Sequence, residues 1–324
     1  MQKICVNMEY LILILSLAGI VLGADFLVKG AVVVARKCKV SSFVIGAVIV
    51  GIGTSLPELV VSTVGAIGGN SEVAIGNVVG SNIFNVFAIL GLTALFFPIA
   101  VSRENMKFEI PFCITVSILL MLLVYNFFVV GEPRLGRWDG VALLLVFTAF
   151  MWISLRRGKN SAAAVGESVE EENKSLWFAA FSILGGLAAL IVSSNFFVDE
   201  AVAIARKLGV SDAFISITLL ACGTSLPELA ASVTAAVKKD TDMALGNIIG
   251  SNIFNATMIL GTASLITPLT TGKIGLVDYG AMILAAVLPM IFGIRGKITR
   301  IEGLLMLLCY AAYTWYIVTY VMDV

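Results

Sequence analysis

Two glutamates lie inside apolar segments of the chain, each next to a proline in the same seven-residue motif. The motif Gly-Thr-Ser-Leu-Pro-Glu-Leu occupies residues 53–59 and returns at residues 223–229 of the 324-residue sequence. A charged side chain inside an apolar segment carries a large free-energy cost. A proline there lacks the backbone N–H and interrupts a helix, which leaves carbonyl oxygens without their usual donor. Because both halves of the chain carry both costs, we interpret Glu58 and Glu228 as functional residues.

Further polar side chains follow the two glutamates at helical spacing. In each half a second motif, Gly-Asn-x-x-Gly-Ser-Asn-Ile-Phe-Asn, occupies residues 76–85 or 246–255. Four sets of polar residues recur at intervals of four, a spacing that places each set on one face of a helix. The sets are Thr54, Glu58 and Ser62; Thr224, Glu228 and Ser232; Asn77, Ser81 and Asn85; and Asn247, Ser251 and Asn255. Glycines four residues apart let helices approach closely, so we expect the four faces to converge on one volume. We expect Asn77 and Asn247 to link helices rather than to contact an ion.

The combined set predicts a site for a hard cation. It offers carboxylates, hydroxyls, amide oxygens and freed carbonyls, and the chain contains no histidine and no Cys-x-x-Cys spacing. Such oxygen donors suit Ca²⁺ and Na⁺ rather than zinc or copper. Ca²⁺ binds about 6–8 oxygens, of which bidentate Glu58 and Glu228 would provide four and the carbonyls of Thr54 and Thr224 two more. Two ionised glutamates balance the charge of one Ca²⁺ or two Na⁺.

Composition defines the class of protein that must position these residues. Hydrophobic residues make up 59% of the chain, charged residues 13%, and the mean hydropathy is +1.03. Soluble domains carry about 25% charged residues, so the sequence predicts an all-α polytopic membrane protein. The formal net charge of zero argues against nucleic acid as a partner. The absence of histidine excludes a His-based catalytic triad, and no nucleophile–base pair indicates an enzyme.

Apolar segments of about 20 residues indicate membrane-spanning helices, and the sequence predicts ten of them. They cover residues 10–35, 42–67, 73–97, 110–129, 138–155, 176–205, 213–237, 243–266, 276–292 and 301–321. The second and seventh are expected to be broken at Pro57 and Pro227. A polar stretch rich in Ala, Ser and Glu, residues 156–175, separates the fifth span from the sixth and is expected to form a solvated linker.

The repeat divides the chain into two five-helix halves, residues 1–155 and 176–324. Residues 53–85 and 223–255 are identical at 18 of 33 positions without a gap. Because each half has an odd number of spans, the halves are expected to insert with opposite topology. Inverted repeats of this kind place a substrate site near the membrane midplane, at the interface between the repeats.

The distribution of Lys and Arg predicts the orientation. Fourteen of these residues fall in the loops on the side of the 156–175 linker and six on the other side. Cytoplasmic loops carry the excess of positive charge. We therefore expect a multi-pass protein of the cell membrane with a cytoplasmic linker and both termini outside.

The paired motifs resemble the two signature repeats of the calcium/cation antiporter superfamily, specifically the sodium/calcium exchangers. The resemblance covers both repeat cores and the ten-span layout. It implies that Glu58 and Glu228 are ligands shared by Ca²⁺ and Na⁺, with the first and sixth helices sliding across the core to switch access. It also implies oxygen ligands from the side chains of Thr54, Ser55, Ser81, Asn85, Thr224, Ser225, Ser251 and Asn255, and backbone carbonyls of Gly51 and Ala221.

One position departs from many members of the superfamily. Many prokaryotic and potassium-dependent relatives carry Asp where this chain has Asn255, which mirrors Asn85 in the first half. The site therefore contains two ionisable groups rather than three. This resembles the potassium-independent exchangers and argues against potassium co-transport.

These features predict a secondary antiporter that exchanges Ca²⁺ for Na⁺, electrogenic at the family's usual 3:1 ratio. The expected substrates are Ca²⁺ and Na⁺, and the protein is expected to lie in a lipid bilayer. We expect neither a cofactor nor an obligate protein partner. A proton/calcium antiporter is the first alternative, because the same glutamates could release protons. A Ca²⁺ channel is less favoured, because channel selectivity filters are usually rings from several subunits, whereas the symmetry here is internal.

Overall fold

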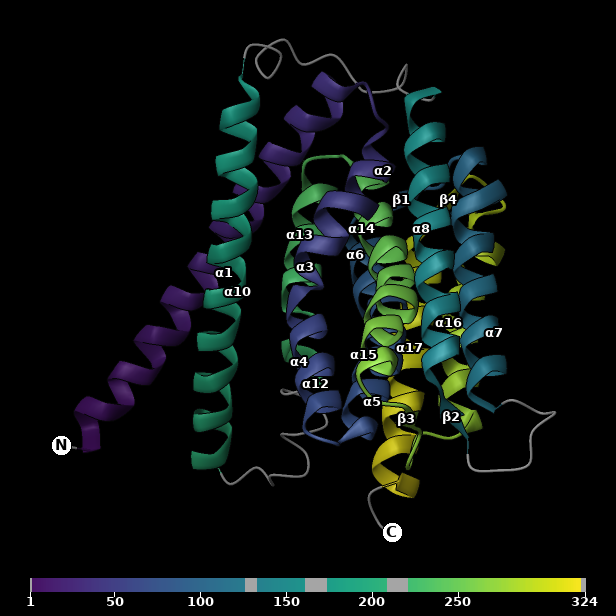
Figure 1. Cartoon of the computed structure of the whole chain (residues 1–324). Helices are drawn as coiled ribbons and strands as arrows, with labels where there is room; N and C mark the ends of the chain where they lie inside the picture. Colours follow the sequence, from purple (N-terminus) through teal and green to yellow (C-terminus); the bar gives the residue numbers. More distant parts are fainter. Residues whose placement is uncertain (1, 126–132, 161–173, 209–220, 322–324) are drawn as a thin grey trace.

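The computed structural model describes residues 2–125, 133–160, 174–208 and 221–321, which form a bundle of helices (Figure 1). The helices of the first half, from the N-terminus, are α1 (Gln2–Cys38), α2 (Ser42–Ile45), the π-helix η1 (Gly46–Gly51), α3 (Ile52–Thr54), α4 (Leu56–Ile67), α5 (Ser71–Phe84), η2 (Asn85–Leu90), α6 (Gly91–Phe96), η3 (Asn105–Glu109), α7 (Ile110–Tyr125) and α8 (Arg137–Asn160). Those of the second half are α10 (Leu176–Lys207), α12 (Ala221–Gly223), α13 (Leu226–Val237), α14 (Thr241–Phe254), η6 (Asn255–Ile259), α15 (Leu260–Ile266), α16 (Leu276–Gly293), α17 (Arg300–Tyr316) and η7 (Ile317–Val321).

Eight described helices are long and apolar enough to cross a membrane, and a bent pair makes up to nine. They coincide with nine of the ten predicted spans. The seventh predicted span, residues 213–237, begins outside the described residues and is described as α12 and α13. The ten-span layout therefore remains a prediction at that one position.

The predicted break in the second span lies two residues earlier than Pro57. The helix bends by 47° at Ser55, between Ser42–Thr54 and Leu56–Ile67. Pro57 lies in the first turn of α4. Backbone N–H groups in a first turn have no acceptor within the helix, so the absent N–H of proline breaks no hydrogen bond there, and the fixed φ of proline suits a helix. The proline therefore starts the second half-helix instead of interrupting one.

Several helix ends differ from the predicted spans. The first helix begins at Gln2 rather than at residue 10, and residues 126–129 of the fourth predicted span lie outside the described residues. The fourth span was expected from residue 110, but its helix includes η3 because the Ser102 hydroxyl accepts a hydrogen bond from the N–H of Asn105 at 3.1 Å. The linker was expected from residue 156, but α8 continues to Asn160. Arg156 stacks on Trp152 one turn earlier, 3.8 Å from the ring centroid, which supports this extra turn.

Equivalent helices of the two halves run in opposite directions. In Figure 1, α1 rises from the N-terminus at the lower end of the molecule to its upper end, whereas α10 descends beside it. The labels α2, α3 and α4 follow one another downward, while α12 lies below α13. The two termini lie at the lower end, and α8 finishes and α10 begins at the upper end.

Four two-residue strands pair across the halves. β1 (Ile99–Ala100) pairs with β4 (Lys297–Ile298) at the upper end, and β2 (Arg134–Leu135) pairs with β3 (Leu269–Thr270) at the lower end. Both pairs are antiparallel and each joins one half to the other. The strands thus connect the ends of the helices that surround the centre of the bundle.

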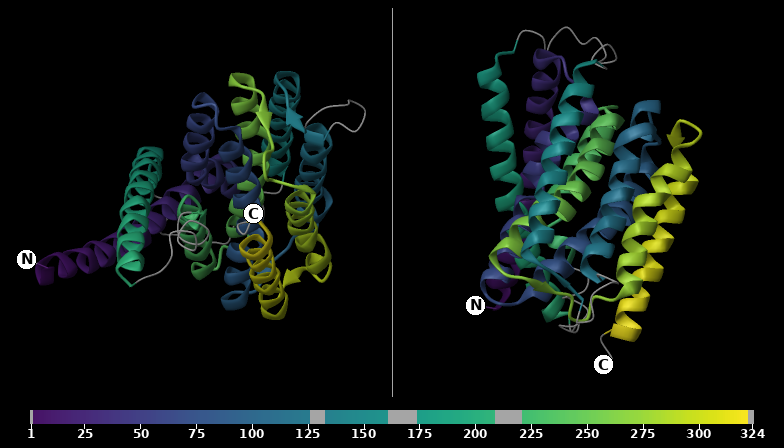
Figure 2. Two further views of the ribbon diagram at one scale, coloured as in Figure 1. Left: turned by 90° about the horizontal axis from the view of Figure 1, so that it is seen from below. Right: turned by 45° about the vertical axis from the view of Figure 1, so that its right-hand side comes forward.

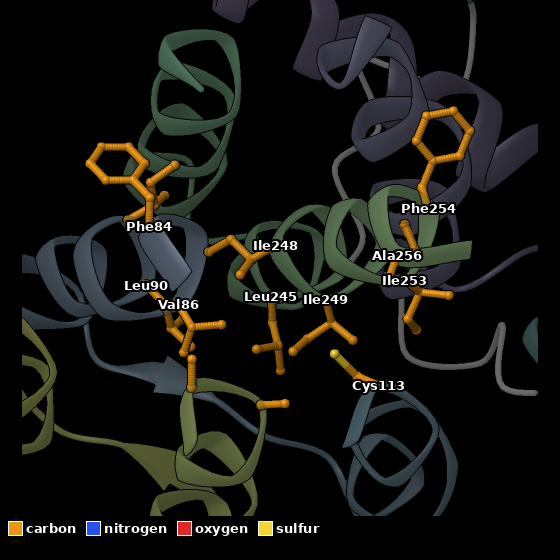
Figure 3. Packing of buried hydrophobic residues seen from close by; sticks show 14 of the residues in the cluster. Phe84, Val86, Leu90, Cys113, Leu245, Ile248, Ile249, Ile253, Phe254 and Ala256 are labelled. Atoms are coloured by element: carbon orange, nitrogen blue, oxygen red, sulfur yellow. The ribbon is translucent and has the colours of Figure 1, made fainter. Parts of the chain in front are cut away.

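The centre of the bundle is α14. All its residues from Met243 to Phe254 are buried, and Figure 3 shows its apolar side chains reaching in different directions. Ile248 points toward the helix that carries Phe84, and Ile249 points toward Cys113 of α7. On another side, a Cβ on Gly246 or Gly250 would meet the backbone of Phe43 or Ala47 within 2.4 Å. Small residues thus bring α14 against α2 and η1, as the glycine spacing predicted for the second half. The first-half pair does not act in this way, because a Cβ on Gly76 would meet only the Ile274 side chain, at 3.5 Å, and a Cβ on Gly80 nothing within 4 Å.

The pair α1 and α10 stands apart from this core. Figures 1 and 2 show the two long helices crossing at one side of the bundle. A Cβ on Gly23 would lie 2.9 Å from the carbonyl oxygen of Gly186, and a Cβ on Gly186 would lie 2.7 Å from that of Gly23. The crossing point therefore depends on glycine in both helices, because no side chain fits between the backbones.

We expect Gly186→Ala to destabilise the α1–α10 pair, because the new Cβ would lie 2.6 Å from the backbone nitrogen of Leu27. Overpacking of this kind costs about 1–3 kcal/mol. Gly185→Ala is the matched control, since its Cβ meets nothing within 4 Å. Thermal unfolding of the purified variants in detergent measures the effect. An unfolding temperature for Gly186→Ala equal to that of Gly185→Ala would contradict the packing argument.

Candidate cation-binding site

The two motif glutamates stand at the N-terminal ends of half-helices. Glu58 lies in the first turn of α4 and Glu228 in the first turn of α13. Both side chains are 0% exposed. The partial positive charge of a helix N-terminus favours a carboxylate, so each half-helix helps to retain a buried negative charge.

Each glutamate is hydrogen-bonded by a serine of the opposite half. The Ser55 hydroxyl donates to Oε1 of Glu228 at 2.7 Å, and the Ser225 hydroxyl donates to Oε1 of Glu58 at 3.0 Å. Both serines occupy N-cap positions, where a serine hydroxyl usually accepts a bond from its own helix. Neither makes such a capping bond. The hydroxyls instead bring the two carboxylates together across the interface of the halves.

Asparagines fix the backbone on which the glutamates stand. The Asn77 side-chain amide donates to the carbonyl of Glu58 at 3.3 Å and to Ser62 Oγ at 3.0 Å. The Asn247 amide makes the equivalent bonds to the Glu228 carbonyl at 3.2 Å and to Ser232 Oγ at 2.8 Å. As predicted, these asparagines link helices, in this case α5 to α4 and α14 to α13.

A second pair of asparagines, which the spacing argument missed, joins the two halves directly. The Asn82 amide donates to the carbonyl of Asn252, and the Asn252 amide donates to the carbonyl of Asn82, both at 3.1 Å. Their side-chain oxygens accept bonds from Asn85 at 3.0 Å and from Asn255 at 3.2 Å. Their presence in both second motifs was the available signal. They were missed because they lie off the four-residue stripes.

Four buried oxygens in this region have no hydrogen-bond partner among the described residues. They are Oε2 of Glu58, Oε2 of Glu228, Oδ1 of Asn85 and Oδ1 of Asn255. A buried acceptor without a partner costs about 1–3 kcal/mol, and more if it is charged. Repulsion between the two carboxylates adds to this cost. No described ion pair reaches either glutamate, so the free oxygens are suited to a cation.

The remaining predicted ligands surround the same place. Thr54 is fully buried, and its hydroxyl lies 3.3 Å from both the Gly51 carbonyl and Asn247 Oδ1. The Ser251 hydroxyl donates to the Gly51 carbonyl at 3.2 Å. Gly51 therefore faces the site with its carbonyl already accepting bonds.

The other predicted ligands are Ser81, Thr224 and Ala221. The Ser81 hydroxyl lies 3.4 Å from that of Ser225. Thr224 interacts with the carboxylate of Glu58. Ala221 is the first described residue of α12, so a role for its carbonyl stays a prediction.

The balance of charged and neutral ligands limits what the site can bind. The described residues contain no group of three or more Asp, Glu, Cys or His that could hold a metal ion. Two carboxylates surrounded by neutral oxygens suit a cation that is transiently bound and released. The π-helices η2 and η6 begin at Asn85 and Asn255, and π-bulges often mark functional positions.

Comparison with known proteins is consistent with this arrangement. A family model described as sodium/calcium exchanger protein matches residues 8–156 and 178–319. The chain belongs to the sodium/calcium exchanger family. Its function is therefore cation and Ca²⁺ antiport across a membrane.

Individual relatives cover almost the full chain. The sodium/calcium exchanger MaX1 of Methanosarcina acetivorans is 35% identical over 342 residues, covering 95% of this chain and 98% of its own length. The putative antiporter CaxA of Alkalimonas amylolytica is 36% identical over 315 residues, covering 93% and 97%. Among solved structures, the sodium-calcium exchanger NCX_Mj soaked with 10 mM Na⁺ and zero Ca²⁺ matches with a TM-score of 0.82 at 33% identity, covering 97% of this chain and 99% of that chain.

We expect Asn252→Ala to weaken Ca²⁺ binding without unfolding the protein. The change removes the donor to the Asn82 carbonyl and leaves the Asn85 amide without its acceptor. Loss of about 1–3 kcal/mol corresponds to roughly 5- to 150-fold in affinity if it falls on the bound state. Calorimetric titration of Ca²⁺ measures it, with Asn70→Ala at an exposed position as control. Unchanged affinity in Asn252→Ala would remove Asn82 and Asn252 from the site.

Proposed function

We propose that the protein is a secondary antiporter that exchanges Ca²⁺ for Na⁺ at one site formed by Glu58 and Glu228. The observation that carries the proposal is the crossed pair of Ser–Glu hydrogen bonds, which leaves the second oxygen of each glutamate free. Two ionised carboxylates neutralise one Ca²⁺ or two Na⁺. Ca²⁺ and Na⁺ would therefore compete for the same oxygens. An empty site would hold two buried carboxylates with no cation to balance them, which is unfavourable in free energy, so one ion would leave as the other binds.

The neutral ligands account for a third Na⁺. Oδ1 of Asn85 and Oδ1 of Asn255 are free and buried, and the hydroxyls of Thr54, Ser81 and Ser251 lie among the other predicted ligands. These groups supply oxygens without adding charge. The carrier loaded with three Na⁺ would then have one more positive charge than the carrier loaded with one Ca²⁺.

Alternating access would follow from two inverted five-helix repeats, residues 1–155 and 176–324, on either side of a short linker. The opposite directions of equivalent helices support this division, as does a family match in two ranges that leaves residues 157–177 between them. The pair α1 and α10 would move against the core, since its glycine-lined crossing makes it a unit that stands apart. The upper end would be cytoplasmic, because the excess of Lys and Arg lies in the loops there.

Proton coupling is the alternative at the same glutamates. Ca²⁺ needs neutral oxygens in either antiporter, because two carboxylates supply at most four of its roughly 6–8 ligands. The other ion distinguishes the two, since a proton binds to a carboxylate alone, whereas Na⁺ must replace its hydration shell with further oxygens. The free Oδ1 atoms of Asn85 and Asn255 therefore favour Na⁺. Ca²⁺ uptake into proteoliposomes loaded with Na⁺, Li⁺ or K⁺, or bearing a pH gradient, distinguishes the two. Uptake driven by the pH gradient and not by internal Na⁺ would establish proton coupling.

We expect Glu58→Gln and Glu228→Gln each to abolish Na⁺-driven Ca²⁺ uptake, because one remaining carboxylate cannot balance Ca²⁺. The amide is of similar size and can still accept the serine hydrogen bond, so the fold should persist. Flux in proteoliposomes is the measurement, and Glu72→Gln, at an exposed position outside the site, is the control. Substantial uptake by either site variant, at parental expression and thermal stability, would refute the shared site.

We expect exchange to respond to the membrane potential. One charge moving through the full field is worth about 2.3 kcal/mol per 100 mV. When Ca²⁺ enters against internal Na⁺, three Na⁺ leave for each Ca²⁺, so an inside-positive potential should speed uptake. A potential set with K⁺ and valinomycin provides the test. Uptake that ignores this potential, with translocation limiting the rate, would indicate 2:1 exchange and no third Na⁺ site.

A further inference from the structure

A cavity of about 480 Å³ lies at the upper end of the molecule, away from the glutamates. It is bounded by the start of η3 and by the turn between α16 and β4. The N–H of Val101 donates to the carbonyl of Gly296 at 2.9 Å, which fixes the two segments beside each other. The cavity therefore lies where one predicted span begins and another ends.

Three cations from two distant segments converge on this cavity. Arg103 and Lys107 lie one helical turn apart, and Arg295 follows the end of α16. None of the lining residues is acidic. Among the described residues, none of the three cations takes part in an ion pair. Three like charges gathered around one cavity without a carboxylate create a site for an anion.

The rest of the lining is apolar. Met106 and Ile294 line the cavity next to the cations, and Ile294 is 74% exposed. A soluble anion would gain nothing from these side chains. A ligand with an anionic head and a hydrocarbon tail would contact both kinds of surface.

The place of the cavity along the helices selects the same kind of ligand. The spans that flank it are Asn105–Tyr125 and Leu276–Gly293, so Arg103 and Arg295 lie just beyond the apolar segments, at the depth of lipid headgroups. Basic pockets at this depth bind anionic headgroups. We propose that the cavity binds one anionic phospholipid, with its phosphate on Arg103, Lys107 and Arg295 and its first acyl carbons along Met106 and Ile294.

The internal repeat shows that the cluster is not a general property of the fold. The residues 170 positions after Arg103 and Lys107 are Lys273 and Val277. The corresponding segment at the lower end, around the start of α16, therefore has a cation at only one of these two positions. An excess of basic loop residues can also serve only to orient the chain. The experiment must therefore separate a local site from the overall charge of this end.

The test is lipid binding to the full-length protein in detergent, followed by native mass spectrometry. Dioleoylphosphatidylglycerol is compared with dioleoylphosphatidylcholine and with inorganic phosphate. The variant Arg103→Gln/Lys107→Gln/Arg295→Gln removes the three cations. The control Lys37→Gln/Lys39→Gln/Lys239→Gln removes three exposed cations of the same end from outside the cavity. All six side chains are exposed, so both variants should fold, which thermal unfolding verifies.

We expect the parent to bind one phosphatidylglycerol at least tenfold more tightly than phosphatidylcholine. The cavity variant should lose at least tenfold in affinity for phosphatidylglycerol and the control no more than about twofold. Ile294→Gln should weaken lipid binding while leaving binding of inorganic phosphate unchanged. Equal losses in the two triple variants would overturn the local site. Phosphate that displaces the lipid at equal concentration, or lipid binding unaffected by Ile294→Gln, would overturn a phospholipid as the ligand.

Discussion

Two buried carboxylates without a basic partner are the constraint on which the rest of this structure depends. Glu58 and Glu228 repel one another, and each has one oxygen without a hydrogen bond. A protein that needed only stability would replace such a pair with apolar residues, because buried charges rarely repay their desolvation. The pair persists here at the N-termini of two half-helices, with a serine from the opposite half on each carboxylate. These supports hold the charges in place but do not neutralise them, which leaves that role to a cation in the proposed site.

The neighbouring polar bonds occur in pairs because the site is built twice. The crossed serine bonds have counterparts at both glutamates, as do the bonds of Asn77 and Asn247. The contacts that occur on one side only, among the described residues, are Thr54–Asn247, Ser251–Gly51 and Ser225–Ser81. The Asn82–Asn252 bonds are reciprocal and so lie where the two halves meet. One half of the chain cannot form this site by itself, because each glutamate is hydrogen-bonded by a serine of the other half. Site formation and association of the halves are thus the same event.

Much of this could be predicted from the sequence, because the two signals involved are local. Apolar length predicts spans, and polar spacing at intervals of four predicts which side chains share a face. The position of the bend was mispredicted because a proline reads as a helix breaker, whereas Pro57 starts a half-helix after the bend at Ser55. Asn82 and Asn252 were missed because their bonds cross between helices from different halves, and no single-helix period encodes such a contact. The cations around the upper cavity come from segments nearly 200 residues apart, so only the fold places them together.

The departures from symmetry matter as much as the symmetry. If the two access states differ only in which half adopts which conformation, two identical halves would give the two states equal free energy. Asp25 on α1 pairs with Lys238 at the end of α13 at 2.7 Å, whereas the positions 170 residues away from these are Asn195 and Gly68. The pair therefore ties the α1–α10 unit to the core on one side only. Both side chains are 29% exposed, and such a pair is worth about 0–1 kcal/mol. A bias of that size would favour one of the proposed access states without trapping the protein in it, which is what repeated exchange requires.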